Sequence, residues 1–485
     1  MKRRINLFSV FAILFFVVLV TTTGCSKKSP EGNVTPPPVT PPVTPLKTDV
    51  AMWLTKPDRS VLFEKQNVSL LFSDATNSNT TITVDDATQY QSIDGFGFAL
   101  TGGSASLINK LPAEQKADLL RELFAADSTY IGISYLRISI GASDMSASDF
   151  TYDDVSGTDV NLDSFSIDAE KTDLIPVLKQ IIAINPSIKI LGSPWTAPPW
   201  MKTNNNYSQG SLKPEYYDAY AKYFVKYIQA MKAEGITIDA ITPQNEPLNA
   251  NNNPSMVMQP VEQENFIKNN LGPQFQTAGL TTKIIIYDHN ADRTDYPLTI
   301  LADPQASQYV DGSAFHLYVG QIGAIAAVHN AYPAKNLYFT EQYTASTGSF
   351  SGDLSWHINN LIIGATRNWC RNVIEWNLAS DPSFGPHTNG GCTTCQGAIT
   401  ISPSISRNVS YYIIAHASKF VRPGAVRIAS DNLSTLPNVA FKNTDGSKVL
   451  IVLNTTNSSL PFNIKFNSKI VTSTLAGGAV ATYKW

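Results

Sequence analysis

The middle of the chain alternates between short apolar segments and longer amphipathic segments, and this alternation constrains the fold more than any other feature. Helical patterns occupy residues 112–124, 215–233 and 354–369, and Pro112 is well placed to start a helix. Between such patterns, eight segments rich in β-forming residues read as strands: residues 95–100, 135–140, 189–193, 240–244, 283–288, 312–315, 336–340 and 372–376. This order predicts an α/β chain with a (β/α)8 TIM barrel over residues 91–424.

A doubly wound sheet is the alternative arrangement for alternating strands and helices. It gives no reason for eight regular units, and no phosphate-binding G-x-G-x-x-G or G-K-S/T motif follows a strand. Apolar residues make up 43% of the chain and charged residues 15%, which is enough to fill one large core. We therefore expect the barrel.

Both ends of the chain outside this region are rich in β-forming residues separated by turn residues. Near the N-terminus, residues 69–72 and 81–84 read as short strands. Near the C-terminus, strands are predicted at residues 439–441, 449–453, 462–464 and 479–483. We expect residues 47–90 and 425–485 to form one β-sandwich beside the barrel.

The first 24 residues have the pattern of a bacterial lipoprotein signal peptide. Three basic residues at positions 2–4 precede an apolar run that is too short for a spanning helix, and small residues then precede Cys25. We expect cleavage before Cys25 and lipid attachment to it; an ordinary signal peptide with a chance Cys is the alternative. Residues 25–46 form a Pro/Thr-rich tether. The pattern predicts an exported bacterial lipoprotein at the outer membrane or cell surface, bound to the membrane through its N-terminal lipid only.

Charge and cysteine content argue against several classes of function. The formal net charge is −3 and the body has no run of Lys or Arg, so nucleic-acid binding has no support. Cys392 and Cys395 form a single C-x-x-C motif without a second pair, which outside the cytoplasm favours a disulfide or an inert loop pair over zinc. Cys370 is expected to be a small buried residue. No cluster of residues has metal-ligand spacing, so we expect no metal and no cofactor.

Two glutamates follow the fourth and seventh predicted strands. Glu246 and Glu341 are 95 residues apart, which corresponds to three βα units of about 30 residues. In a (β/α)8 barrel both strand ends open on the same face. One carboxyl group could protonate a departing glycosidic oxygen while the other attacks the anomeric carbon, and their proximity would separate their pKa values. The pair therefore predicts glycoside hydrolysis.

Five segments resemble glycoside hydrolase family 30: DGFG at residues 94–97, LRISIGASD at 136–144, SPWTAPPWMK at 193–202, TPQNEP at 242–247 and FTE at 339–341. The resemblance runs from about residue 50 to the end, and the family includes glucosylceramidase, β-1,6-glucanase and glucuronoxylanase activities. It implies a barrel fused to a side β-sandwich, with Glu246 as general acid/base and Glu341 as nucleophile of a retaining mechanism. It implies that Asn245 contacts the sugar 2-hydroxyl. Further implied sugar-binding residues are Arg137, Asp144, Trp195, His316, Tyr318 and Trp376.

Some of these residues also have a structural explanation. Arg137 could orient Glu341 through charge-assisted hydrogen bonds instead of contacting sugar. His316 is expected to form hydrogen bonds behind the carboxyl groups rather than to carry the catalytic proton.

Two features of the sequence favour the β-1,6-glucanase branch. In the exo-acting glucosidases of the family, an Asp at the position of Gly102 binds hydroxyl groups of the terminal sugar. Because Gly102 lacks this carboxylate, we expect room there for a polysaccharide chain that continues past the site. The loop at residues 377–396 has no Arg or Lys to bind a glucuronate, and its Gly, His and Cys content resembles that branch. We expect an endo-β-1,6-glucanase acting on β-glucan; the alternatives are an exo-β-glucosidase or glucosylceramidase-like enzyme, and a non-catalytic surface glycan-binding lipoprotein.

Overall fold

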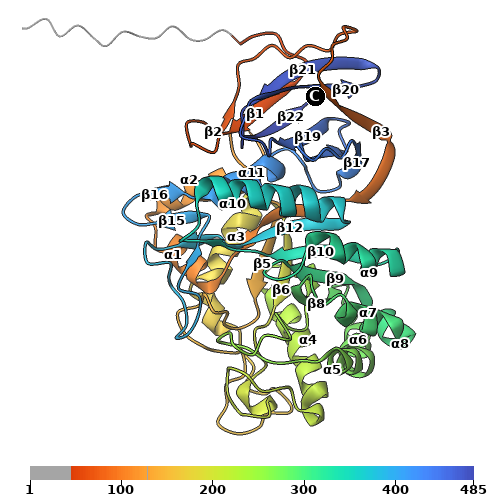
Figure 1. Ribbon diagram of the computed structural model, residues 1–485. Coiled ribbons are helices and arrows are strands. Elements are labelled where there is room, and N and C mark those ends of the chain that lie inside the picture. The colour runs from red at the N-terminus through yellow and green to blue at the C-terminus, as the bar shows by residue number, and fades with distance from the viewer. Residues whose placement is uncertain (1–44, 128) are drawn as a thin grey trace, which may run out of the picture. The chain divides into compact units, whose positions relative to one another are not determined.

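The computed structural model describes residues 45–127 and 129–485, which form a barrel and a β-sandwich (Figure 1). The predicted signal peptide, Cys25 and all but the last two residues of the predicted tether lie outside the described residues. Within the described ranges, no helix has the length and apolar character needed to cross a membrane.

Parallel strands close the barrel that the sequence predicts, in the order β10-β12-β4-β5-β6-β7-β8-β9. Their bounds are β4 (Gly95–Ala99), β5 (Tyr135–Ser139), β6 (Lys189–Ser193), β7 (Ala240–Ile241), β8 (Lys283–Asn290), β9 (Val310–His316), β10 (Asn336–Glu341) and β12 (Cys370–Asn377). Strand β7 is shorter than predicted because Pro243 has no N–H for the ladder. All eight predicted strands coincide with these eight, and the predicted fold class is confirmed.

Helices lie between the barrel strands and cover them. Their bounds are α1 (Gly102–Asn109), α2 (Ala113–Phe124), α3 (Leu174–Ile184), α4 (Tyr217–Ala233), α5 (Pro260–Phe266), α6 (Gly272–Thr277), α7 (Asp295–Ala302), α8 (Pro304–Ser307), α9 (Ala326–Ala331), α10 (Phe350–His357) and α11 (Val409–Ser418). Helix α2 begins directly after Pro112, as predicted, and buries Leu119, Leu120, Leu123 and Phe124. The helix predicted at residues 354–369 is α10 continued by a π-helical segment, η6 (Ile358–Ala365).

An apolar layer fills the barrel below its carboxyl-terminal end. It takes one buried side chain from each of seven strands: Tyr135, Leu191, Ala240, Ile285, Ala314, Tyr338 and Ile374. Side chains alternate along a strand, so the next inward position lies two residues further on. In six strands that position holds Arg137, Ser193, Thr242, His316, Thr340 and Trp376. The polar residues of the mouth therefore rest on a packed core.

Both ends of the chain contribute to a second β structure, as predicted, in which every strand pair but one is antiparallel. Figure 1 shows the first strands in red and orange beside the last strands in blue. The sheet order is β2-β1-β22-β19-β18-β17-β3-β20-β21. The strands are β1 (Ala51–Thr55), β2 (Leu62–Lys65), β3 (Thr80–Ser92), β17 (Val426–Ser430), β18 (Asn438–Lys442), β19 (Lys448–Leu453), β20 (Leu460–Phe466), β21 (Lys469–Leu475) and β22 (Val480–Lys484).

The strand predicted at residues 69–72 is wrong. The Leu70 N–H donates to the Thr48 hydroxyl at 3.0 Å and the Phe72 N–H donates to the Asp49 carboxylate at 3.0 Å. These side-chain acceptors replace the backbone partners of a β-ladder. The next residue, Ser73, forms an isolated bridge to Ile470.

Strand β19 is apolar along most of its length because both of its faces are buried. Val449, Ile451 and Leu453 pack into the core that the sandwich shares with the barrel. Leu450 and Val452 point the other way, into the interior of the sandwich. A sheet with one face in water would alternate apolar and polar residues. The continuous apolar sequence of β19 therefore reflects the contact between the sandwich and the barrel.

Leu450→Ala and Ile451→Ala test this double burial, since the two side chains point in opposite directions. Each substitution should lower the free energy of unfolding by about 2–5 kcal/mol, because each leaves a cavity in a packed core. Urea titration of the two variants would measure the loss. Lys465→Ala, at an exposed position of β20, is the control and is expected to change stability by less than about 0.5 kcal/mol. A near-neutral result at either core position would contradict the double burial.

Candidate active site

A cavity of about 550 Å³ opens at the carboxyl-terminal end of the barrel. This volume is typical of ligand sites. Its lining residues are Asp144, Glu246, Leu248, Asn249, Asn251, Asn252, His289, Asn290, Tyr318, Glu341, Tyr343, Trp376, Cys392 and Cys395. Five of the nine predicted site residues are among them. The other four, Arg137, Trp195, Asn245 and His316, are buried beneath the cavity.

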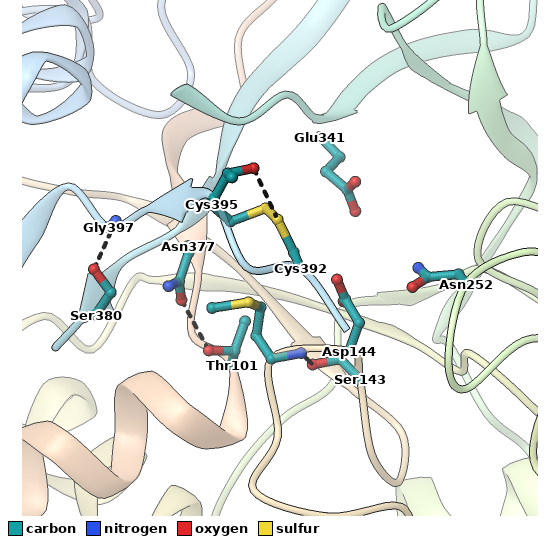
Figure 2. The surroundings of a disulfide bond; sticks show 12 residues. Thr101, Ser143, Asp144, Asn252, Glu341, Asn377, Ser380, Cys392, Cys395 and Gly397 are labelled. Atoms are coloured by element: carbon teal, nitrogen blue, oxygen red, sulfur yellow. Dashed lines mark hydrogen bonds between the residues drawn. A yellow bond between two sulfur atoms is a disulfide. The ribbon is translucent and has the colours of Figure 1, made fainter. Parts of the chain in front are cut away.

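Glu246 and Glu341 face each other in this cavity, as their positions in the sequence predict. One carboxylate oxygen from each and one ring nitrogen of His316 all lie within 4.8 Å of one another. Figure 2 shows the Glu341 and Asp144 carboxyl groups directed into the same open space. Three such donors could in principle hold a metal ion. His316, however, bonds to carboxylates through both ring nitrogens, and an imidazolium has no lone pair for a metal.

The backbone at Glu246 is left-handed, with a φ of +43°. Tyr287 and Asp288, at the end of β8, have φ values of +75° and +65°. A left-handed residue other than glycine costs about 1–2 kcal/mol. The Glu246 N–H donates to the Asp288 carbonyl at 3.0 Å, so a hydrogen bond joins two of these left-handed residues. Strained positions of this kind gather at functional sites.

Arg137, from β5, holds the floor of the site and is fully buried. Its Nη1 donates to Glu341 Oε2 at 2.6 Å. Its Nη2 donates to Asn245 Oδ1 and to Asp288 Oδ2, each at 2.7 Å. The guanidinium also lies 4.9 Å from the ring centre of Trp195. Arg137 therefore contacts protein groups and orients Glu341.

Asp288 connects the strands under the site and is not among the site residues predicted from the sequence. Its carboxylate accepts hydrogen bonds from Arg137, His316 and three hydroxyl groups, those of Ser193, Thr242 and Thr340. Burial raises the pKa of Asp288, but the charge of Arg137 and the bond from His316 outweigh it and hold the pKa well below its usual value. The available signal was the polar run Asp288-His289-Asn290 after an apolar strand.

His316, at the end of β9, joins Asp288 to Glu246. Its Nδ1 is 3.1 Å from Glu246 Oε1 and its Nε2 is 3.1 Å from Asp288 Oδ1. Burial lowers the pKa of His316, but the charge of Glu341 and the bonds to Asp288 and Glu246 raise it to about 9. His316 thus carries a proton near neutral pH and donates it toward Glu246.

The two glutamates have different partners. Glu341 accepts from Arg137 through Oε2 and from the Tyr318 hydroxyl through Oε1, the latter at 2.9 Å. Glu246 contacts His316 and accepts from Asn249 Nδ2 at 2.7 Å. Burial raises the pKa of Glu341, and the charges of His316 and Arg137 offset only part of the rise, so the pKa stays above its usual value. Burial also raises the pKa of Glu246, but the bond and charge of His316 bring it down to about 2.

Aromatic and acidic groups form one wall of the cavity. The Trp195 and Trp376 rings are 5.3 Å apart, with Trp376 at the surface of the cavity. Asp144 Oδ1 is buried and has no hydrogen-bond partner among the described residues. Burial, and then the charges of Glu341 and Glu246, raise the pKa of Asp144 to about 8. A protonated Asp144 can both donate to and accept from a ligand hydroxyl.

The space predicted beside Gly102 is filled in the structure. A Cβ atom at Gly102 would lie 3.1 Å from the Ser146 hydroxyl oxygen. Gly102 is not among the residues that line the cavity. The loop after β12 passes close by, because a Cβ at the adjacent Gly103 would lie 2.9 Å from the Pro386 carbonyl oxygen. Gly102 therefore gives no room to a continuing sugar chain.

Facing carboxyl groups at this distance are the means by which glycoside hydrolases cleave a glycosidic bond, and the chain is an enzyme of this class. Residues 93–421 match the glycosyl hydrolase family 30 TIM-barrel domain, and residues 424–483 match the glycosyl hydrolase family 30 beta sandwich domain. The chain belongs to glycoside hydrolase family 30, as the resemblance of its motifs implied.

Relatives match across both domains. An endo-1,6-β-D-glucanase of Aspergillus fumigatus is 36% identical over 405 residues, which cover 77% of this chain and 81% of that protein. The endo-1,6-β-D-glucanase BGN16.3 of Trichoderma harzianum is 35% identical over 418 residues, covering 81% and 84%. The solved structure of the endo-β1,6-glucanase BT3312 has a TM-score of 0.85 and 40% identity, and the match covers 90% of this chain and 99% of that chain.

Asp288→Asn should lower the pKa of His316 from about 9, because it removes a negative charge that stabilises the imidazolium. His316 would then lose its proton at a lower pH, by about one pH unit or more. Titration of the His316 ring signals by NMR would measure the change. Asp292→Asn, in the exposed loop after β8, is the matched control and should leave the His316 pKa unchanged. An unchanged pKa in Asp288→Asn would contradict the network.

Proposed function

We propose that the chain is a retaining endo-β-1,6-glucanase that cleaves β-glucan by double displacement. The observation that carries the retaining mechanism is the separation of Glu246 and Glu341, whose nearest ligand-capable atoms are within 4.8 Å. Inverting enzymes separate the two carboxyl groups by about 6.5–9.5 Å to admit a water molecule. The linkage is supported by the similarity to endo-β-1,6-glucanases over both domains.

The partners of the two glutamates support their roles. Glu341 accepts from Arg137 and Tyr318, and an ionised carboxylate satisfies both donors. Arg137 keeps its proton at any physiological pH, so Glu341 is well suited to remain an anionic nucleophile. Glu246 instead shares a hydrogen bond with His316, a group that can exchange a proton. Glu246 is therefore the general acid/base.

The pKa of Glu246 is low because His316 carries the proton that lies between the two side chains. Moving that proton across the 3.1 Å contact to Glu246 Oε1 leaves a neutral imidazole and a protonated acid, without any change in net charge. Asp288 still accepts from the other ring nitrogen. Because His316 loses its proton as the pH rises through about 9, the supply of protonated Glu246 should end there as well.

Hydrolysis then takes two displacements. Glu341 attacks the anomeric carbon while Glu246 gives its proton to the departing oxygen, which forms a covalent glycosyl-enzyme. Glu246, now ionised, takes a proton from water, and the water oxygen attacks the same carbon and releases Glu341. Trp376 offers a face for the sugar ring, and Asp144 and Asn245 offer hydrogen bonds to its hydroxyl groups. Arg137 and His316 act from beneath by holding the two carboxyl groups.

An exo-β-glucosidase is the second candidate, because loops close one side of the cavity. The Thr388 hydroxyl donates to the Asn253 carbonyl at 2.6 Å, and Asn253 Nδ2 donates to the Asn389 carbonyl at 2.6 Å. These bonds join the loop after β7 to the loop after β12. A site closed on that side would favour a chain end over the middle of a polysaccharide.

Product analysis separates the two candidates. Protein from residue 47 onward, incubated with β-1,6-glucan, should release a ladder of β-1,6-linked oligosaccharides whose new ends keep the β configuration by NMR. Release of glucose alone, or activity only on a β-glucosyl lipid, would replace the endo assignment with the exo one. Inverted products would contradict the retaining mechanism.

Azide distinguishes the two glutamates in the same assay. In Glu341→Gly, azide can occupy the place of the nucleophile, so an activated β-glucoside should give an α-glucosyl azide. In Glu246→Gly, azide replaces water in the second displacement, and the product should be a β-glucosyl azide. The reverse assignment of products would exchange the two roles.

We also propose that the enzyme is exported and attached to a bacterial membrane by a lipid on Cys25. The support is the sequence pattern of residues 1–25, with basic residues, an apolar run and small residues before the cysteine. The Pro/Thr-rich residues after Cys25 would separate the catalytic domain from the membrane surface.

Cys25→Ala tests the lipid attachment. The unchanged chain, expressed in a Gram-negative host fed an alkyne fatty acid, should carry the label and sediment with membranes. Cys25→Ala should lose the label, whereas Cys370→Ala, at a buried cysteine of the barrel, should retain it. An unlabelled wild-type chain would contradict the proposal.

A further inference from the structure

Cys392 and Cys395 form a disulfide in the wall of the active-site cavity. The sequence left open whether these residues form a bond. Figure 2 shows the disulfide beside the space into which Glu341 and Asp144 point, with Asn252 on the opposite side. Neither the network under the glutamates nor the proposed chemical steps use this bond.

Cys395 is the fixed half of the disulfide. It begins the short strand β14 (Cys395–Gln396) and pairs with Ala345 of β11 (Thr344–Ala345), just after Glu341. Its side chain is buried in a cluster with Trp195 and Trp376. Cys395 is thus attached to the strand end that carries one glutamate and to the aromatic wall of the cavity.

Cys392 is the half that approaches Asp144. The Thr388 N–H donates to the Asp144 carbonyl at 2.9 Å. Three residues later the chain passes even closer, because a Cβ at Gly391 would lie 2.2 Å from that same carbonyl oxygen. Only glycine permits this approach. Burial raises the pKa of Asp144, and a hydrogen bond from the Cys392 backbone N–H opposes part of that rise.

We propose that the Cys392–Cys395 disulfide is a specificity-determining part of the sugar site, which holds the Cys392 amide against Asp144 and fixes Asp144 relative to Trp376. The inference rests on the proposed function, since the ligand is the glucosyl unit that Glu341 attacks. Cys392 is only partly buried, and its bond to buried Cys395 holds its sulfur against the aromatic cluster of the cavity wall. The Asp144 carboxyl group, which lines the cavity, is then available to a sugar hydroxyl in one defined direction.

The disulfide should act on sugar binding more than on bond cleavage. Glu341 and Glu246 are held by Arg137, Asn249 and His316, none of which belongs to the loop after β12. Opening the disulfide should therefore raise KM by about tenfold and change kcat by less than about twofold, as expected when binding common to ground state and transition state is lost.

Reduction and substitution provide two independent ways to open the bond. A water-soluble phosphine supplies two electrons, becomes the phosphine oxide with oxygen from water, and leaves two thiols. The reduced wild type and the double variant Cys392→Ala/Cys395→Ala should show the same rise in KM on β-1,6-gluco-oligosaccharides. The phosphine should have no further effect on the double variant, which controls for other actions of the reductant. Thr393→Ala, exposed within the same loop, should behave as wild type.

Binding without catalysis gives a second measurement. Calorimetric titration of Glu341→Gln with the same oligosaccharides should show about tenfold weaker binding after reduction. Thiol counting would verify that the bond is open, and thermal melting would verify that the protein is folded. Unchanged KM and affinity in verified, folded, reduced protein would overturn the proposal, and so would a loss confined to kcat. A wild type inactive on β-1,6-linked substrates in both redox states would instead refute the proposed function, and the titration would then be repeated with whichever β-glucoside the enzyme cleaves.

Discussion

The buried ion pair between Arg137 and Asp288 is the interaction on which the geometry of the site depends. Neither side chain has any exposed area, and Arg137 Nη2 is 2.7 Å from Asp288 Oδ2. Removing one partner would leave an uncompensated buried charge, which costs about 3–5 kcal/mol. Asp288 is further satisfied by hydroxyl groups from three barrel strands, and Arg137 extends its other nitrogen to Glu341. The position of Glu341 is therefore set by strands, which hold a catalytic group more rigidly than loops do.

The same network makes two chemically identical residues different. Glu341 faces a permanent cation, whereas Glu246 faces a histidine whose proton can move. Asp288 binds both of these partners at once, so the two environments are coupled through a single carboxylate. In the proposed mechanism the proton moves from His316 to Glu246, so the site would keep one net charge while it changes from a resting form to an acid.

Much of this site follows from the sequence, because strand ends of a barrel meet at one face. That rule placed Glu246 and Glu341 together, and period-two alternation places Arg137 and His316 above the apolar layer. The inward direction of the Asp288 side chain could not be predicted from period-two alternation. The register of β8 shifts between Tyr287 and His289, and a left-handed backbone turns Asp288 inward out of phase. The folded path of the loop, rather than the C-x-x-C spacing, likewise decides that Cys392 and Cys395 meet in the cavity wall.

The sandwich contacts barrel strands at the ends that lie opposite the active site. The chain enters the barrel and leaves it side by side, since the Ile93 N–H donates to the Ala425 carbonyl at 2.7 Å and the Gly424 N–H donates to the Ile93 carbonyl at 2.8 Å. Gln91, at the end of β3, donates to the Cys370 carbonyl at the start of β12. Strand β12 then runs to Trp376 and the disulfide loop. The side domain thus bonds to the lower end of β12 and to the residues that lead into β4, at the opposite end of these strands from the aromatic wall.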